Sequence, residues 1–164
     1  MILGIMADTH DRLPLIDRAV SEFNERGIEL VVHAGDFIAP FVVPRFKPLK
    51  AKLIGVFGNN DAELALLKRR FAEMKSEIRG RFGGINIEGL KIAILHGEEV
   101  ELLESLINTG SYNVIVHGHT HKAETYRKGG TLVINPGETC GYLTGESTIA
   151  VLDTKTLEVE KIQL

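Results

Sequence analysis

The sequence lacks the features on which several classes of protein depend. Cys140 is its only cysteine, which excludes an internal disulfide framework and an all-cysteine zinc site, and suits a reducing compartment. The formal net charge is -3, so no basic field is available for strong nucleic-acid binding. No apolar run approaches the roughly 18 residues of a membrane span, and the opening MILGIMADTH has no basic leader or cleavage site. We therefore expect a cytoplasmic protein that does not enter a membrane.

The composition is that of a globular chain. Of the 164 residues, 44% are hydrophobic and 25% are charged, which fits one compact domain over residues 1–164. The chain contains no linker, no low-complexity tract and no sequence repeat. The sequence leaves open whether exposed parts of its C-terminal hairpins form a homodimer interface.

Strands and helices are expected to alternate in the first two thirds of the chain. Apolar runs and amphipathic periodicity predict strands at 1–7, 30–34, 53–57, 92–95 and 114–117, and helices at 13–25, from about 62, and at 100–107. The stretch 42–46 is a weaker helix candidate because prolines interrupt it. This alternation predicts a mostly parallel sheet. Two hairpins, 124–135 and 148–164, are expected in the last third.

Polar residues gather just after the predicted strands. In chain order, the clusters are Asp8 and His10; Gly35 and Asp36; Gly58, Asn59, Asn60 and Asp61; His96 and Gly97; and Gly118-His119-Thr120-His121. Because the carboxyl ends of strands share one edge of an open α/β sheet, where ligands bind, these five loops are expected to converge on one crevice.

The side chains in these loops are suited to binding metal ions. The turn at Gly118 carries two of the chain's 6 histidines at alternate positions, and a metal needs neutral imidazole nitrogens delivered from a rigid loop. The carboxylate, imidazole and amide donors together suit borderline divalent ions such as manganese, iron, cobalt, nickel or zinc. They suit a magnesium-only site or a thiolate zinc site poorly.

The order of these motifs is characteristic of a known family. The set Asp8-x-His10, Gly35-Asp36, Gly58-Asn59, His96-Gly97 and Gly118-His119-x-His121 resembles that of the calcineurin-like metallophosphoesterase superfamily, above all its short, archaeal-type phosphodiesterase branch. The resemblance extends from Ile5 to the C-terminal hairpins. The segment Asn135-Pro136-Gly137-Glu138 and the following 140–145 are similar to small archaeal members in particular.

The resemblance implies a fold and a set of metal ligands. The fold is α/β, a four-layer α/β/β/α sandwich with two mixed sheets flanked by helices. Two divalent metal ions are implied, with manganese or nickel preferred and iron, cobalt or zinc as alternatives. One ion would be held by Asp8, His10, Asp36 and His121 and the other by Asp36, Asn59, His96 and His119. Asp36 would bridge the two ions, and Asp36, Asn59 and His96 would be the catalytic residues.

The activity implied is that of a phosphoric diester hydrolase acting on small phosphodiesters. In this two-metal mechanism, a hydroxide shared by both ions attacks phosphorus in line with the leaving alcohol. The sequence departs from the wider family at Asn60, where a histidine often protonates the leaving group, and at Glu98, where related phosphodiesterases often have a histidine. We interpret both changes as favouring diesters with acidic leaving groups over doubly charged monoesters.

Simpler interpretations apply to several of these residues. Asp36 and Asn59 taken singly are ordinary turn residues, and Asp8 is a conceivable helix cap, although Asp11 is the better cap candidate. His33 and His117 lie within apolar strands, so we expect them to be structural or to support a ligand. Cys140 is expected to be inert, and Glu98 and Glu99 to begin the next helix.

Two other functions remain as alternatives. One is a metal-binding scaffold for protein interactions, because the family includes a retromer subunit with this fold. A pure scaffold has no reason to keep all seven donors, and all seven are present. The other alternative is a phosphomonoesterase, although the usual acid histidine is missing.

Overall fold

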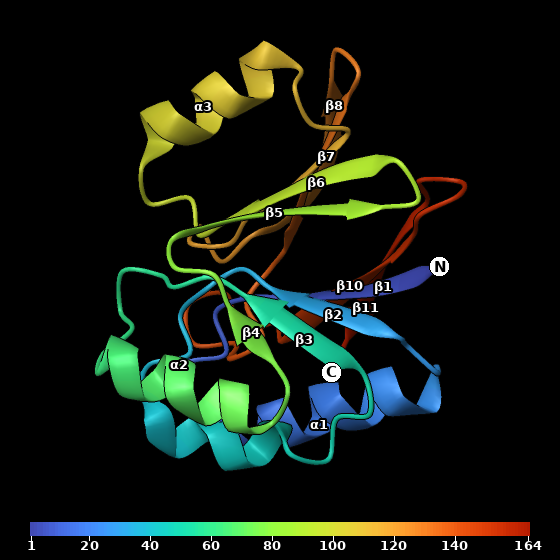
Figure 1. Cartoon of the computed structure of the whole chain (residues 1–164). Helices are drawn as coiled ribbons and strands as arrows, with labels where there is room; N and C mark the ends of the chain where they lie inside the picture. The colour runs from blue at the N-terminus through green and yellow to red at the C-terminus, as the bar shows by residue number, and fades with distance from the viewer.

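Two β-sheets lie face to face and helices cover the outer face of each (Figure 1). The computed structural model describes residues 1–164. The first sheet has the order β11-β10-β1-β2-β3-β4 and comprises β1 (Ile2–Met6), β2 (Leu30–His33), β3 (Lys52–Gly55), β4 (Glu77–Ile78), β10 (Thr148–Asp153) and β11 (Val159–Gln163). The second has the order β5-β6-β7-β9-β8 and comprises β5 (Phe82–Ile87), β6 (Leu90–Leu95), β7 (Val114–Val116), β8 (Ala123–Lys128) and β9 (Thr131–Pro136).

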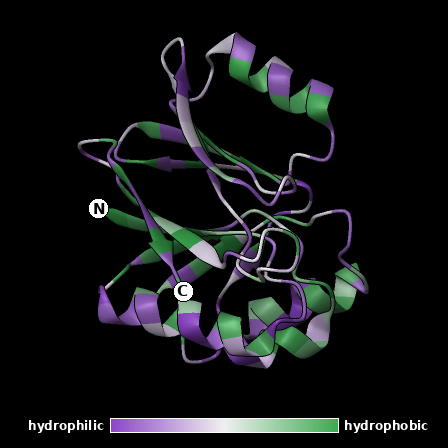
Figure 2. Cartoon of the chain, turned by 180° about the vertical axis from the view of Figure 1, so that it is seen from behind, coloured by the Kyte–Doolittle hydropathy of each residue, from purple (hydrophilic) through white to green (hydrophobic).

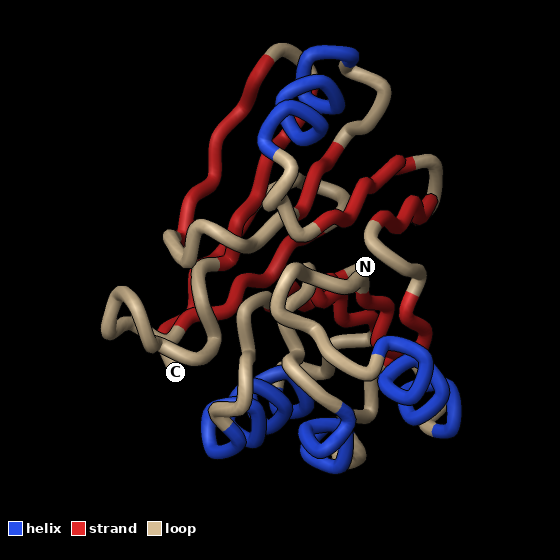
Figure 3. Tube along the Cα trace, turned by 90° about the vertical axis from the view of Figure 1, so that its left-hand side faces the viewer, coloured by secondary structure: helices blue, strands red, loops and turns tan.

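The helices form the two outer layers. The first sheet is covered by α1 (Leu13–Glu25), the 3-10 helix η1 (Pro40–Phe46) and α2 (Leu64–Glu73), and the second by α3 (Val100–Thr109). These layers separate clearly when the molecule is viewed from the side (Figure 3). The four-layer α/β/β/α sandwich implied by the family resemblance is therefore confirmed.

Alternating side chains divide the core into three parts. Ile5 faces the space between the sheets, whereas its neighbour Met6 packs toward α1, η1 and α2. In the second sheet, Ile94 belongs to the core between the sheets and Leu95 to the smaller core beneath α3. This period of two is what strands buried on both faces require. In Figure 2 hydrophobic stretches lie along the strands in the middle of the molecule, outer strands are partly hydrophilic, and the helices alternate between the two.

Several predicted elements are observed at their expected places. Helix α1 has the predicted bounds, with Pro14 in its first turn and buried Ile16, Ala19, Val20 and Phe23 on one face. The proline-containing stretch forms the 3-10 helix η1 rather than an α-helix. Both C-terminal hairpins form, as β8–β9 and as β10–β11.

The expectation of one mostly parallel sheet is wrong. The alternating strands divide between two mixed sheets: β1, β2 and β3 pair in parallel in the first, and β6 and β7 pair in parallel in the second. Two strands were not predicted: β4, which has only two residues, and β5, which contains Gly83 and Gly84. The chain passes from one sheet to the other between these two strands.

Asp11 does not cap α1, because Arg12 occupies the cap position and no side chain forms a hydrogen bond there. The Asp11 carboxylate instead accepts a hydrogen bond from Tyr142. No helix in the structure has both the length and the apolar character required to cross a membrane.

Candidate metal centre

The seven predicted ligands meet at the carboxyl ends of strands from both sheets. The loops after β1, β2 and β3 carry Asp8, His10, Asp36 and Asn59, and the loops after β6 and β7 carry His96, His119 and His121. The cluster thus lies where the two sheets meet and not at the edge of a single sheet. Their role as metal ligands stays a prediction, but their positions can be described directly.

Asp36 lies at the middle of the cluster. Its Oδ2 atom is 3.5 Å from His10 Nε2 and 3.4 Å from His96 Nε2. The second buried carboxylate, Asp8, has its Oδ1 atom 3.5 Å from His121 Nε2 and 3.9 Å from His96 Nε2. Two carboxylates and three imidazoles therefore share one small volume, and one oxygen of Asp36 lies close to imidazoles from different sheets.

Asn59 and His119 form the more open side of the cluster. Asn59 Oδ1 is 3.1 Å from His119 Nδ1, and the His119 ring lies 5.2 Å from the His96 ring between centroids. Asn59 is exposed and His119 is half-buried, whereas Asp8, Asp36 and His96 are buried. Asn59 and His119, together with the half-buried His10, are therefore the members of the cluster that a molecule from solution can reach.

Three buried polar atoms of the cluster have no hydrogen-bond partner. They are Asp8 Oδ1, His10 Nε2 and His96 Nε2. Such atoms are rare, because an unpaired buried polar group costs free energy. Donor atoms of Asp8, His10 and Asp36 also lie within 4.8 Å of one another. Unpaired oxygen and nitrogen donors that converge in this way match the requirements of a divalent cation.

Neighbouring acceptors orient two of the imidazoles. His96 Nδ1 is 2.7 Å from the Ala34 carbonyl oxygen, and His121 Nδ1 is 2.6 Å from Glu138 Oε2. Both acceptors require a proton on Nδ1, so each neutral ring has its Nε2 lone pair directed toward the two central carboxylates. This is the tautomer needed to bind a metal through Nε2.

The backbone is strained where it delivers the ligands. Ten residues other than glycine have a positive φ angle, and five of them are predicted ligands: Asp8, His10, Asp36, His119 and His121. The left-handed region is unfavourable for residues with a Cβ atom, and such strain gathers at functional sites. The strained backbone at these positions therefore lowers the stability of the fold while it directs the side chains toward one point.

Close backbone approach explains two of the glycines. A Cβ atom at Gly58 would lie 2.1 Å from Asp36 Oδ1, and one at Gly118 would lie 2.6 Å from Asp8 Oδ2. Any larger residue at either position would displace a central carboxylate. These glycines accompany the ligands in the motifs because the loops pass against the carboxylates.

Burial and charge shift the pKa values of the buried groups in opposite directions. Burial raises the pKa of Asp8 to about 6. Burial also acts to raise the pKa of Asp36, but its contacts with His96 and Asn60 outweigh burial and hold that pKa below its usual range. Burial acts to lower the pKa of His96, but the contact with Asp36 outweighs it and raises the pKa to about 9. A proton on His96 Nε2 would compete with any cation for this nitrogen.

Glu138 supports the cluster and was missed as a functional residue. Its fully buried carboxylate accepts hydrogen bonds from six donors: His121 Nδ1, Cys140 Sγ, Tyr142 N, Leu143 N, Thr144 N and Thr144 Oγ1. Burial acts to raise its pKa, but these bonds, that of His121 foremost, lower the pKa to about 2. Glu138 follows Asn135-Pro136-Gly137 in a segment that resembles the family, but nothing in that segment indicates that it contacts His121.

Asp61 has a similar supporting role on the other side. Its carboxylate accepts hydrogen bonds from the backbone N–H groups of Asp36, Ile38 and Gly58. It thereby joins the loops that follow β2 and β3. Asp61 was predicted to lie with Gly58, Asn59 and Asn60 after a strand, but nothing in the sequence indicated this supporting role.

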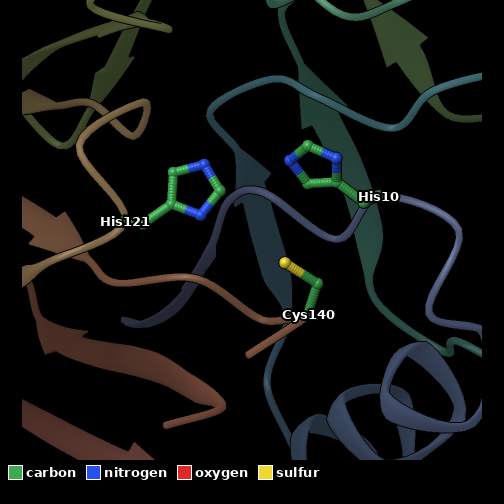
Figure 4. Close-up of side chains that lie close together, drawn as sticks. All are labelled: His10, His121 and Cys140. Atoms are coloured by element: carbon green, nitrogen blue, oxygen red, sulfur yellow. The ribbon is translucent and has the colours of Figure 1, made fainter. Parts of the chain in front are cut away.

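The other histidines and the cysteine lie next to the cluster. His33 is fully buried, stacks on Phe37 at 3.6 Å between ring centroids and has its Nε2 3.0 Å from Thr9 Oγ1. His117 is buried with Nδ1 3.1 Å from the Gly118 carbonyl oxygen. Figure 4 shows Cys140 below the rings of His10 and His121, with its sulfur atom directed toward them. Burial raises the pKa of the Cys140 thiol to about 12, which supports the expectation of an unreactive group.

Asn60 and Glu98, the two residues that depart from the family pattern, each form hydrogen bonds with a neighbouring side chain. Asn60 donates to Asp36 twice, from Nδ2 to Oδ2 at 2.7 Å and from its backbone N–H to Oδ1 at 2.9 Å. Glu98 Oε1 accepts from Arg81 Nη1 at 2.8 Å. Arg81 offsets the charge of Glu98, so Glu98 discourages monoesters less than the sequence alone suggests. The expectation of diester specificity then depends on Asn60.

The fold and the cluster together define a metallophosphoesterase. The chain belongs to the calcineurin-like phosphoesterase superfamily, whose domain model matches residues 1–157. Among known proteins, it is 44% identical to phosphodiesterase MJ0936 of Methanocaldococcus jannaschii, over 100% of this chain and 99% of that one. It is also similar to the solved structure of an archaeal phosphodiesterase, with a TM-score of 0.96, 43% identity and 100% of both chains covered.

A more distant structural relative shares the fold. Vps29 of Entamoeba histolytica has a TM-score of 0.73 at 19% identity, and the match covers 100% of this chain and 99% of that one. At this identity the likeness concerns the sandwich alone.

Proposed function

We propose that this chain is a metal-dependent phosphodiesterase that hydrolyses small phosphodiesters at the seven-residue cluster. The family membership and the 44% identity to a phosphodiesterase support this activity. The observation that carries the proposal is the position of Asp36. One of its carboxylate oxygens lies within 3.5 Å of His10 Nε2 and 3.4 Å of His96 Nε2, as a ligand shared by two sites requires.

The donor set fits two divalent ions. Asp8, His10, Asp36 and His121 would hold one ion, and Asp36, Asn59, His96 and His119 the other. The unpaired atoms of Asp8, His10 and His96 support this assignment. Mixed nitrogen and oxygen donors favour manganese or nickel, with iron, cobalt and zinc as alternatives. When bound, such ions supply Lewis acidity, which offsets the charge of a phosphate and makes water acidic near neutral pH.

The chain's own residues position the reaction. Asp36 places a negative charge between two sets of imidazoles, and Asn60 holds both of its oxygens. Glu138 and the Ala34 carbonyl oxygen fix the rings of His121 and His96. Asn59 and His119 lie at the open side, where an incoming phosphate meets the cluster. Groups held in place before substrate arrives need no reorganisation during the reaction.

The leaving group must depart largely as an anion in this proposal. The side-chain amide of Asn60 has no proton of useful acidity and is committed to Asp36. Diesters of acidic alcohols, such as nitrophenols, should therefore react much faster than alkyl diesters. This is the reason for preferring a diesterase over a phosphomonoesterase.

A hydrolysis panel tests the proposal. Chelator-treated protein is reloaded with each divalent ion in turn and assayed on aryl and cyclic diesters and on aryl monoesters. We expect metal-dependent hydrolysis of the aryl diesters, with the monoesters much slower. Bound metal without hydrolysis of any ester would instead favour the interaction scaffold, and faster monoester hydrolysis would favour the phosphomonoesterase.

A further inference from the structure

An exposed apolar surface lies directly beside the charged cluster. Tyr142 is 49% exposed and Leu143, its neighbour, is 75% exposed. The Tyr142 ring meets the His10 ring edge to face, with 6.2 Å between centroids. A large aromatic side chain thus lies next to a predicted metal ligand and remains open to solvent.

The Tyr142 ring is held in place from both ends. Its hydroxyl donates to Asp11 Oδ1 at 2.7 Å, and its backbone N–H donates to Glu138 Oε2 at 3.0 Å. The guanidinium carbon of Arg12, an exposed residue, lies 5.1 Å from the ring centroid. A ring fixed in advance loses little conformational entropy when it binds a ligand. Surface packing alone does not require an aromatic group to be both fixed and half-exposed.

We propose that Tyr142 is a specificity-determining residue that stacks a flat aromatic group of the phosphodiester. This inference rests on the proposed diesterase function and names its substrate class: diesters in which at least one ester group is aromatic or carries a nucleobase. A group joined to phosphorus through an ester oxygen extends away from the cluster, and on the His10 side it meets Tyr142. The Arg12 guanidinium lies over the ring and adds a positive charge and a planar surface there.

A purely structural role makes different predictions. If Tyr142 only ties its loop to Asp11, loss of the hydroxyl matters and loss of the ring does not. If the ring stacks on substrate, Tyr142→Phe keeps the function and Tyr142→Leu loses it. Tyr126 is 37% exposed and lies on β8, the edge strand of the second sheet. Tyr126→Leu is therefore a matched control for removal of a surface tyrosine.

The experiment compares two ligands that differ only in their ester groups. NMR titrations of zinc-loaded protein measure the dissociation constants of diphenyl phosphate and dimethyl phosphate. We expect diphenyl phosphate to bind about tenfold more tightly, the scale of one aromatic stack, to the unmodified protein, Tyr142→Phe and Tyr126→Leu. Tyr142→Leu should lose most of that preference while its affinity for dimethyl phosphate and its zinc content stay unchanged.

A second arm distinguishes aryl groups from nucleobases. The methyl phosphodiester of a nucleoside 5′-phosphate is compared with the same compound lacking its base; a preference for the base that Tyr142→Leu removes identifies nucleotide diesters as substrates. An equal diphenyl preference in the unmodified protein and Tyr142→Leu, or no preference in either, overturns the inference. These titrations measure binding, and the same spectra reveal any hydrolysis of diphenyl phosphate, so a failure of this inference can be told apart from a failure of the hydrolysis panel.

Discussion

At the scale of single residues, Asp36 lies at the middle of the cluster. Its carboxylate lies between imidazoles that come from loops of two different sheets, and the Asn60 amide fixes it there. Residue types and order were sufficient to select Asp36 from the sequence. The sequence could not reveal that one oxygen contacts His10 and His96 at nearly equal distances, because that depends on how the sheets pack.

Replacement of Asp36 should affect both metal sites. We expect Asp36→Asn to weaken metal binding and to lower kcat/KM at least about 100-fold, because loss of a mere supporting partner already costs about 10- to 100-fold. The measurements are metal affinity by calorimetry and diester hydrolysis. Asp17→Asn is the matched control, since Asp17 is exposed and pairs with Arg45 on the surface. Equal behaviour of the two variants would argue against a shared ligand.

Glu138 should contribute to stability in a pH-dependent way. Its pKa in the folded protein is about 2, against an ordinary value of 4.5. Since the folded pKa is the lower one, its contribution is present above pH 4.5 and is lost as the pH falls toward 2. The size of the contribution at pH 7 is about 3 kcal/mol.

Replacement of Glu138 tests this contribution. We expect Glu138→Gln to lower the unfolding free energy of chelator-treated protein at pH 7, and the difference from the unmodified protein to shrink as the pH falls below 4.5. Denaturant unfolding at several pH values measures it. Glu146→Gln, at an exposed glutamate near Lys161, is the control. A difference that does not change with pH would show that ionisation of Glu138 is not the source.

At the scale of elements, the loops after the strands carry the candidate ligands. The strand ends were predictable because apolar runs stop where polar motifs begin, and helix α1 was predictable from its periodicity and its proline. Strand β5 was not, because its glycines weaken both the apolar pattern and the strand propensity. The membership of each strand in one sheet or the other depends on pairing between distant segments, which local patterns do not encode.

The loop after β3 provides a test at this scale. A Cβ atom at Gly58 would lie 2.1 Å from Asp36 Oδ1 and 2.7 Å from Asp36 N, so Gly58→Ala must move one loop. We expect metal affinity to fall at least about tenfold, comparable with the loss of a supporting contact, while circular dichroism stays close to that of the unmodified protein. A Cβ atom at Gly130 meets nothing within 4 Å, which makes Gly130→Ala the control. Unchanged metal affinity in Gly58→Ala would contradict the close approach.

At the scale of the whole molecule, two sheets combine to build one site. The first sheet supplies Asp8, His10, Asp36 and Asn59, and the second supplies His96, His119 and His121. All seven candidate donors predicted from the sequence lie together, but a single sheet edge was expected. Supporting residues such as Glu138 and Asp61 were not identifiable, because their partners come from loops distant in the chain. The sandwich is therefore necessary for the cluster, and separation of the sheets would abolish it.

The central claim is that this cluster binds two divalent ions and that both are needed for diester hydrolysis. It is tested most directly by titrating metal into chelator-treated protein while metal content and hydrolysis of a nitrophenyl diester are measured on the same samples. We predict that activity rises with the second ion and saturates at two ions per chain. Full activity in metal-free protein, or saturation of activity at one ion per chain, would contradict the claim.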